Sequence, residues 1–234
     1  MNKASIVIAT RNRAPQLRLA LESIRLKNYR DVEVVVIDDA STEETASVLR
    51  DYGKLVHVER IERPGGYRRN PSSVLNVGHL LAKTDIVIEQ GGEICHLTDC
   101  VTPLYETCRP GVVALARVYH GTVAEMELLE KDIEDGKYVF PENVKLEIVR
   151  TLGKHWPVPR IGSHQIYLYT GKERPAPFLF LGAIHQKDFS AIGGYDENIT
   201  TNNDGDLANR LSVKGMKFCF VGNAVAFHLK HGKS

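Results

Sequence analysis

The chain has 234 residues, of which 43% are hydrophobic and 25% are charged, and its formal net charge is +1. These values predict a globular domain with a core of its own, and they exclude a chain-wide basic field that would attract nucleic acid or acidic membranes. The four cysteines fit neither a disulfide framework nor a zinc motif, so we expect reduced thiols. No apolar run has the length of a signal-peptide core or a bilayer span, which predicts a soluble, cytoplasmic protein.

Strands and helices alternate over the first hundred residues. Short β-branched runs predict strands at 5–10, 32–41, 54–61 and 85–90, and apolar residues at helical spacing predict helices at 14–28, 42–53 and 73–84. This alternation is typical of a Rossmann-type parallel sheet, in which ligands bind at the carboxyl ends of the strands. The polar residues that follow each strand are therefore the first candidates for a site.

The second half is less regular. We expect helices at 101–110, 122–136 and 203–215, a strand at 111–121, and a loop-rich stretch at 144–165. Residues 177–197 predict a strand, a short helix and a turn, and residues 217–232 predict a strand, a turn and a second strand.

Two adjacent aspartates, Asp38 and Asp39, end the second predicted strand. Their charges repel each other, so another group must compensate. Either carboxylate can accept hydrogen bonds from a ribose or a base, and either can instead cap the following helix. After the third strand, an arginine-rich loop surrounds a Gly-Gly pair, and its guanidinium groups suit phosphate oxygens unless the loop is merely a solvated surface. Its arginines are Arg60, Arg63, Arg68 and Arg69.

Residues Gly91-Gly92-Glu93 follow the fourth strand. The two glycines leave room for a sugar or a phosphate, and Glu93 adds a carboxylate. Glu93 is a hard oxygen ligand of the kind that Mg²⁺ or Mn²⁺ prefers, and His228, after the last apolar run, is a second candidate ligand. Asp204 and Asp206 open a late helix, where acidic residues either complement the helix dipole or, in the case of Asp204, serve as a general base.

Taken in chain order, six segments of the sequence resemble the family 2 glycosyltransferases of the GT-A fold. The segments that carry the resemblance are SIVIATRNRAPQLRLALESI, VEVVVIDDAS, NPSSVLNVGHLLAKTDIVI, FLGAIHQKDFSAIGGYDENI, NNDGDLANRLSVKGMKFCFV and AVAFHLKH. The resemblance implies one α/β domain whose mixed, mostly parallel central sheet is flanked by helices. Residues 1–100 would form the nucleotide-sugar-binding half, and residues 101–234 the acceptor-binding and catalytic half.

The resemblance also implies a reaction, which moves a sugar from a nucleotide-diphosphate sugar, such as a UDP-sugar, to an acceptor hydroxyl. Asp204 stands where the family has its catalytic base, although Asn203 replaces the usual glutamate before it. The implied donor-binding residues are Thr10, Arg11, Arg13, Asp38, Asp39, Arg69, Asn76, Gly91 and Gly92. The implied acceptor-binding residues are Gly182, Ala183, Trp156 and Asp206.

The sequence departs from the family at the metal motif. The family usually has Asp-x-Asp where this chain reads Gly91-Gly92-Glu93. Either Glu93 and His228 hold Mn²⁺ or Mg²⁺ together with the diphosphate, or arginines supply part of the charge.

Three alternatives stay open at this stage. The broken metal motif also suits a catalytically inactive nucleotide-sugar-binding module. Compact transferases of this kind include viral enzymes that glycosylate a modified base in DNA, which would act in the host cytoplasm with nucleic acid as the partner. A nucleotidyltransferase is the third alternative, and the late NDGDL and histidine pattern does not favour it.

Overall fold

The computed structural model of the protein describes residues 2–63, 65, 70–120, 127, 131, 147–148, 166–169 and 180–229. Its helices are α1 (Ala14–Lys27), α2 (Glu43–Asp51), α3 (Pro71–Leu81), α4 (Val101–Thr107), α6 (Gln186–Ala191) and α7 (Asn203–Val213). Its strands are β1 (Ala4–Thr10), β2 (Val32–Asp39), β3 (His57–Ile61), β4 (Ile86–Gly91), β5 (Ile94–His96), β6 (Val112–His120), β7 (Glu147–Ile148), β8 (Ile166–Tyr169), β9 (Leu181–His185) and β10 (Lys217–His228). The helix expected at 122–136 and the loop expected at 144–165 lie almost entirely outside the described residues.

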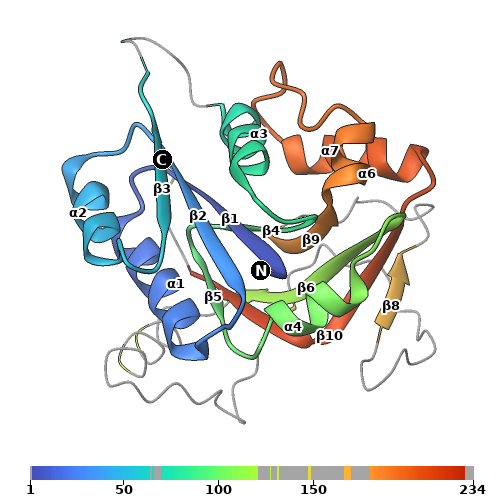
Figure 1. Ribbon diagram of the computed structural model, residues 1–234, viewed down its shortest axis with the longest axis horizontal. Helices are drawn as coiled ribbons and strands as arrows, with labels where there is room; N and C mark the ends of the chain where they lie inside the picture. The colour runs from blue at the N-terminus through green and yellow to red at the C-terminus, as the bar shows by residue number, and fades with distance from the viewer. Residues whose placement is uncertain are drawn as a thin grey trace.

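One twisted sheet runs through the molecule in the order β3-β2-β1-β4-β9-β6-β10-β5, while β7 pairs with β6 and β8 with β10 (Figure 1). Strands β3, β2, β1 and β4 are parallel to one another. Strand β9 is antiparallel to both β4 and β6, and β10 is parallel to β6. The predicted α/β class with a mixed, mostly parallel central sheet is confirmed.

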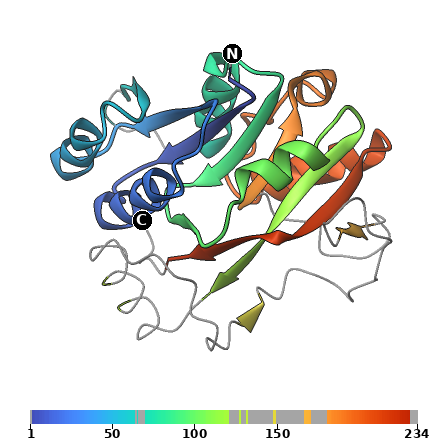
Figure 2. The same cartoon turned by 60° about the horizontal axis from the view of Figure 1, so that its bottom comes forward.

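Helices cover both faces of this sheet, as the two views in Figures 1 and 2 show. Apolar side chains of α1, α2 and α4 pack on one face together with Ile6, Ile8 and Val36. On the other face, α3 packs against Val7 and its neighbours, and α6 and α7 pack against β6 and β10. Because successive strand residues point to opposite faces, the uninterrupted apolar run of β1 is buried on both sides.

The last strand differs from the prediction. Residues 217–232 were expected to form a strand, a turn and a second strand, but β10 is one strand of 12 residues with a register shift between Val221 and Val225. The shift absorbs Gly222, Asn223 and Ala224 as an irregularity within the strand, which a local turn signal cannot distinguish from a true turn. Strand β5, of three residues, was not predicted. None of the described helices has the length and apolar content needed to cross a bilayer.

Candidate active site

The carboxyl ends of β1, β2 and β4 meet at one edge of the sheet, which we call the donor rim and define by residues 10–13, 38–42 and 91–93. Thr10 lies beside Asp38 in register, and Ala9 lies beside Gly91. The loops after β1 and β2 are tied together, since the Asn12 amide donates to Ser41 Oγ (3.0 Å) and the Thr42 amide donates to Asn12 Oδ1 (2.8 Å). Asn12 has a φ of 51°, a conformation that asparagine tolerates. Hydrogen bonds within the protein therefore hold the two loops of the rim together.

Two arginines from the edge of the sheet compensate the adjacent aspartates. Arg60 Nη1 donates to Asp38 Oδ2 at 2.6 Å, and Arg63 Nε donates to Asp39 Oδ1. Arg11 Nη1 lies 3.6 Å from the other oxygen of Asp39. Both aspartates are almost fully buried, and buried charges of this kind require partners of opposite charge. The compensation that the adjacent aspartates require thus comes from Arg60 and Arg63, for which the sequence left phosphate contact and a solvated surface loop as the alternatives.

Three buried polar atoms of the donor rim lack a hydrogen-bond partner among the described residues. They are Thr10 Oγ1, Arg11 Nη1 and Asp39 Oδ2. Polar atoms buried in this way are rare, because each costs free energy unless a partner satisfies it. One hydroxyl, one guanidinium nitrogen and one carboxylate oxygen, grouped at the ends of parallel strands, can together accept from and donate to a polar, anionic ligand.

The glycine pair after β4 keeps two functional groups close to the rim. A Cβ on Gly92 would lie 3.1 Å from Thr10 Oγ1, and a Cβ on Gly91 would lie 3.0 Å from the carboxylate of Glu93. Any side chain at these positions would crowd the hydroxyl or displace the carboxylate. Glu93 Oε1 in turn lies 3.6 Å from His228 Nε2, because β5 pairs with the end of β10. Neighbouring residues therefore extend from Asp39 to His228, through Arg11, Thr10, the two glycines and Glu93.

Glu93 and His228 are the two residues that the sequence suggested as metal ligands. Among the described residues, no group of three or more His, Cys, Asp or Glu side chains could hold a metal ion. A carboxylate with an imidazole still suits Mn²⁺ or Mg²⁺, since these ions are often held by one or two protein ligands and complete their coordination with phosphate oxygens and water. The pair therefore has the chemistry of a partial site for such an ion.

Asp204 is the second residue of α7 and is only partly exposed. Burial raises the pKa of its carboxyl group, and the negative charge of Glu89 raises that pKa further. The backbone amide of Gly205 donates to Asp204 Oδ1 at 2.9 Å and acts in the opposite direction. A carboxylate whose pKa is raised is a stronger base than an ordinary aspartate. It is therefore better suited to accept a proton.

Other predicted site residues have protein partners. Asp206 accepts from Arg210 Nε at 2.7 Å. Asn76 accepts from the amide of Tyr195 and donates to its carbonyl oxygen. Gly182 and Ala183 lie inside β9, buried between β4 and β6. Arg13 caps α1, where its carbonyl oxygen accepts from the Leu17 amide at 2.7 Å. Arg69 and Trp156 lie outside the described residues.

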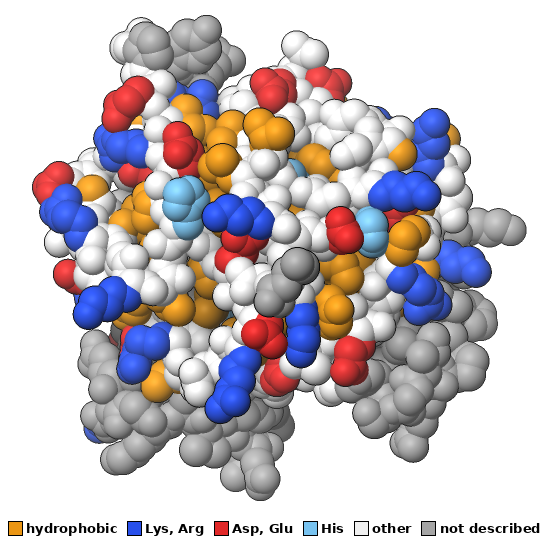
Figure 3. Space-filling model, in the orientation of Figure 1, with side chains coloured by type: hydrophobic (Ala, Val, Ile, Leu, Met, Phe, Trp, Pro, Cys, Tyr) orange, Lys and Arg blue, Asp and Glu red, His pale blue; other side chains and the backbone are white. Residues whose placement is uncertain are grey.

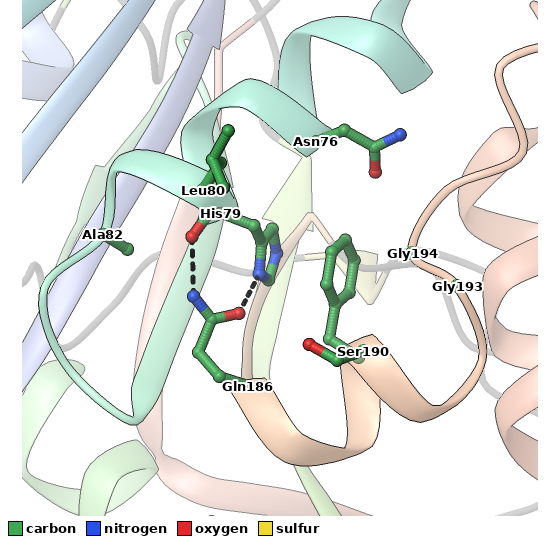
Figure 4. A pocket seen from close by; sticks show the side chains of 9 residues that line it. Asn76, His79, Leu80, Ala82, Gln186, Ser190, Gly193 and Gly194 are labelled. Atoms are coloured by element: carbon green, nitrogen blue, oxygen red, sulfur yellow. Dashed lines mark hydrogen bonds between the residues drawn. The ribbon is translucent and has the colours of Figure 1, made fainter.

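A buried polar network beside the rim was not predicted. Glu89 Oε1 lies 2.5 Å from His79 Nε2, and the hydroxyl of Tyr195 donates to Glu89 Oε2, also at 2.5 Å. All three side chains are at most 3% exposed. His79 also contacts Gln186, and its ring stacks on Phe189 along a groove of about 440 Å³ (Figure 4). The one available signal was a carboxylate inside an apolar strand, since Glu89 follows directly after Ile88.

Comparisons with known proteins agree with this architecture. Residues 5–144 match the family model described as Glycosyl transferase family 2. The match covers more than half of the chain, so the chain belongs to glycosyl transferase family 2, a family of sugar-transferring enzymes. A segment of 54 residues is also 37% identical to the GalNAc(5)-diNAcBac-PP-undecaprenol beta-1,3-glucosyltransferase of Campylobacter jejuni, over 23% of this chain and 18% of that enzyme.

Solved structures share the fold at low sequence identity. The mannosyltransferase PcManGT from Pyrobaculum calidifontis, in complex with GDP-Man and Mn²⁺, has a TM-score of 0.62 and 17% identity over 98% of this chain and 58% of its own. TarS 1–349 from S. aureus, in complex with UDP-GlcNAc, has a TM-score of 0.64 and 15% identity over 100% of this chain and 60% of its own. The GT-A fold predicted from the resemblance is confirmed. The chain spans less than two thirds of the length of each of these relatives.

Proposed function

We propose that the protein transfers a sugar from a nucleotide-diphosphate sugar to an acceptor hydroxyl. The observation that carries this proposal is a group of buried atoms at the donor rim that make no hydrogen bond to the described residues: Thr10 Oγ1, Arg11 Nη1 and Asp39 Oδ2. Within these residues, the last two form only an ion pair, at 3.6 Å. A nucleoside diphosphate offers what these atoms need, namely hydroxyl and ring N–H donors for the carboxylate and anionic oxygens for the guanidinium. A UDP-sugar is the proposed donor.

The electrostatics of the rim support a diphosphate. Asp38 and Asp39 are offset by Arg60 and Arg63, so Arg11 adds a positive charge that the rim does not neutralise by a hydrogen bond. Glu93 and His228 would hold Mn²⁺ or Mg²⁺, which when bound offsets the charge of the departing nucleoside diphosphate.

In the proposed reaction, Asp204 accepts the proton of the acceptor hydroxyl as that oxygen forms its bond to the anomeric carbon. The bond from the anomeric carbon to the diphosphate breaks at the same time, and its electron pair stays with the phosphate oxygen. General base catalysis of this type contributes about 10²- to 10⁴-fold to a rate. The raised pKa of Asp204 supports the assignment.

For a nucleic-acid acceptor one would look for a basic patch, yet on the face drawn in Figure 3 basic and acidic side chains are interspersed. The net charge of +1 points the same way. We therefore propose an acceptor that is recognised through its hydroxyl groups, and not through a phosphate backbone.

The test combines donor binding with catalysis. Thermal shift with UDP-GlcNAc, UDP-Glc and GDP-Man, with and without Mn²⁺, identifies the donor, because a ligand at 100 times its Kd adds about 2.7 kcal/mol of stability. Asp204→Asn should then lower the release of nucleoside diphosphate by about 10²- to 10⁴-fold while the thermal shift is retained.

The matched control is Asp51→Asn, the same chemical change at an exposed carboxylate that pairs with Arg18; it should keep full activity. Failure of all three nucleotide sugars to stabilise the protein would contradict the donor assignment. Stabilisation without any product from the unmodified protein would instead favour an inactive binding module.

A further inference from the structure

Helix α7, which carries Asp204 in its first turn and Arg210 in its last, is joined to strand β4 through a single turn, residues 192–197. Arg210 on α7 donates from Nη1 to the carbonyl oxygens of Gly194 (2.7 Å) and Ile192 (3.1 Å). The next residue of the turn, Tyr195, donates its hydroxyl to Glu89 in the middle of β4. The helix of the proposed base and the strand that leads to Gly91 and Glu93 are thus connected by two consecutive residues.

The turn itself is held rigidly from a third element. Asn76 on α3 bonds to both the amide (2.9 Å) and the carbonyl oxygen (3.0 Å) of Tyr195. Gly194 has a φ of 70°, and a Cβ there would lie 2.8 Å from Asn76 Oδ1. Because the turn is hydrogen-bonded to α3, α7 and β4, it fixes the positions of these three elements relative to one another.

The donors and acceptors around His79 require a proton between His79 Nε2 and Glu89 Oε1. Gln186 Nε2 donates to the carbonyl oxygen of His79 (2.6 Å), so its Oε1 faces His79 Nδ1 (2.9 Å). The Nδ1 atom must therefore carry a hydrogen. The 2.5 Å contact between Nε2 and Glu89 Oε1 then needs one more proton, which the two groups share.

We propose that Glu89 is a positioning residue of the transfer reaction, which holds Asp204 in place through Tyr195 and the turn that Arg210 clamps. The inference rests on the proposed function. The charged and titratable groups around the two carboxylates are His79 from α3, Tyr195 from the turn, and Asp206 and Arg210 from α7. Burial is the main cause of the raised pKa of Asp204, and the charge of Glu89 adds to it, so besides the mechanical connection the same residue contributes to how strongly the base holds a proton.

Two variants separate the mechanical effect from the effect of charge. Tyr195→Phe removes only the hydroxyl that joins the turn to β4. Glu89→Gln keeps every bond of the network, because the glutamine oxygen can accept from Tyr195 and its amide can donate to Nε2 of a neutral His79, while the charge beside Asp204 is lost. Both variants should fold, and thermal unfolding with and without UDP-GlcNAc checks this.

The readout is the release of UDP from UDP-GlcNAc with water as the acceptor, measured as kcat and KM against pH. We expect Tyr195→Phe to lower kcat about ten-fold with an unchanged KM. We expect Glu89→Gln to keep the plateau value of kcat within about three-fold, with the acid limb of its pH profile moved to lower pH. The direction follows from charge, since removing a neighbouring negative charge lets Asp204 lose its proton at lower pH.

The control for the hydroxyl deletion is Tyr52→Phe, which removes a hydroxyl bond of 2.9 Å to Glu22 far from α7 and should leave kcat unchanged. A native kcat in Tyr195→Phe, or an unmoved acid limb in Glu89→Gln, would overturn the inference. Asp204→Asn, measured in parallel, separates a failure of the proposed function from a failure of the inference on Glu89. If Asp204→Asn is fully active, the assignment of Asp204 as the base is wrong. If it is inactive while the other two variants behave as the unmodified protein, only the role of Glu89 is wrong.

Discussion

Two neighbouring glycines in the turn before Tyr195 allow a quantitative test of how tightly the site is built. Gly193 and Gly194 both have left-handed φ angles, of 78° and 70°. They differ in their surroundings, since a Cβ on Gly193 would meet nothing within 4 Å. On Gly194, a Cβ would lie 2.8 Å from Asn76 Oδ1 and 3.0 Å from Phe189 Cε1. Replacing each by alanine therefore imposes the same backbone strain but different steric strain.

The magnitudes follow from these two contributions. A left-handed alanine costs about 1–2 kcal/mol, which is the whole expected effect of Gly193→Ala. In Gly194→Ala, overpacking against Asn76 and Phe189 adds about 1–3 kcal/mol, for a total of roughly 2–5 kcal/mol. For a domain of this size, about 1 kcal/mol corresponds to 2–4 °C in Tm. Gly194→Ala should therefore melt several degrees below Gly193→Ala.

The assay is urea unfolding, followed by circular dichroism, of the unmodified protein and both variants. A shift of the midpoint at a constant m-value would show that only stability changed. Nearly equal losses in the two variants would refute the reasoning, because they would mean that the carboxamide of Asn76 moves away at no cost and does not hold the turn.

Two further predictions concern the donor rim and pH. Gly92→Ala should weaken UDP binding about 5- to 30-fold in calorimetry, since its Cβ would crowd Thr10 Oγ1. The control is Gly111→Ala, just before β6, whose Cβ meets nothing within 4 Å and which should bind UDP normally. Equal affinities would argue against a ligand at the Thr10 hydroxyl. Burial lowers the pKa of His96 from 6.5 to about 3, so the unfolded chain binds a proton that the folded protein does not. The stability present at neutral pH should fall by about 1.4 kcal/mol per unit as the pH drops below about 6.5. Melting curves at pH 7, 6 and 5 should be less pH-dependent for His96→Gln, and parallel slopes would contradict the assignment.

The regular part of the fold could be predicted from sequence because its signals are local. The β-branched runs of β1, β2 and β4 and the helical spacing of α1 identify these elements to within a few residues. The prediction failed at β10, where a bulge near Gly222 continues the strand through residues typical of a turn. It also missed β5, whose three residues form a strand only because β10 lies beside them.

The site was harder to predict, because its contacts join residues that are distant in sequence. Arginines near a Gly-Gly pair suggest phosphate binding, and only the register of β2 with β3 shows that Arg60 faces Asp38 instead. Similarly, a glutamate after Ile88 marks an anomaly but not its partners. Tyr195, which satisfies Glu89, follows 106 residues later in the chain, and no local pattern connects the two.

The position of β9 has a consequence for synthesis of the chain in the cell. Residues 86–90 pair with residues 181–185, so about ninety residues must be added after β4 before its open side is covered; at typical translation rates this takes roughly 5–20 s. During that interval Ile86, Val87 and Ile88 expose an apolar strand edge, which is the type of surface that chaperones capture and that neighbouring nascent chains can pair with. Fragments that stop short of β9 should keep this edge permanently and aggregate, while longer ones cover it.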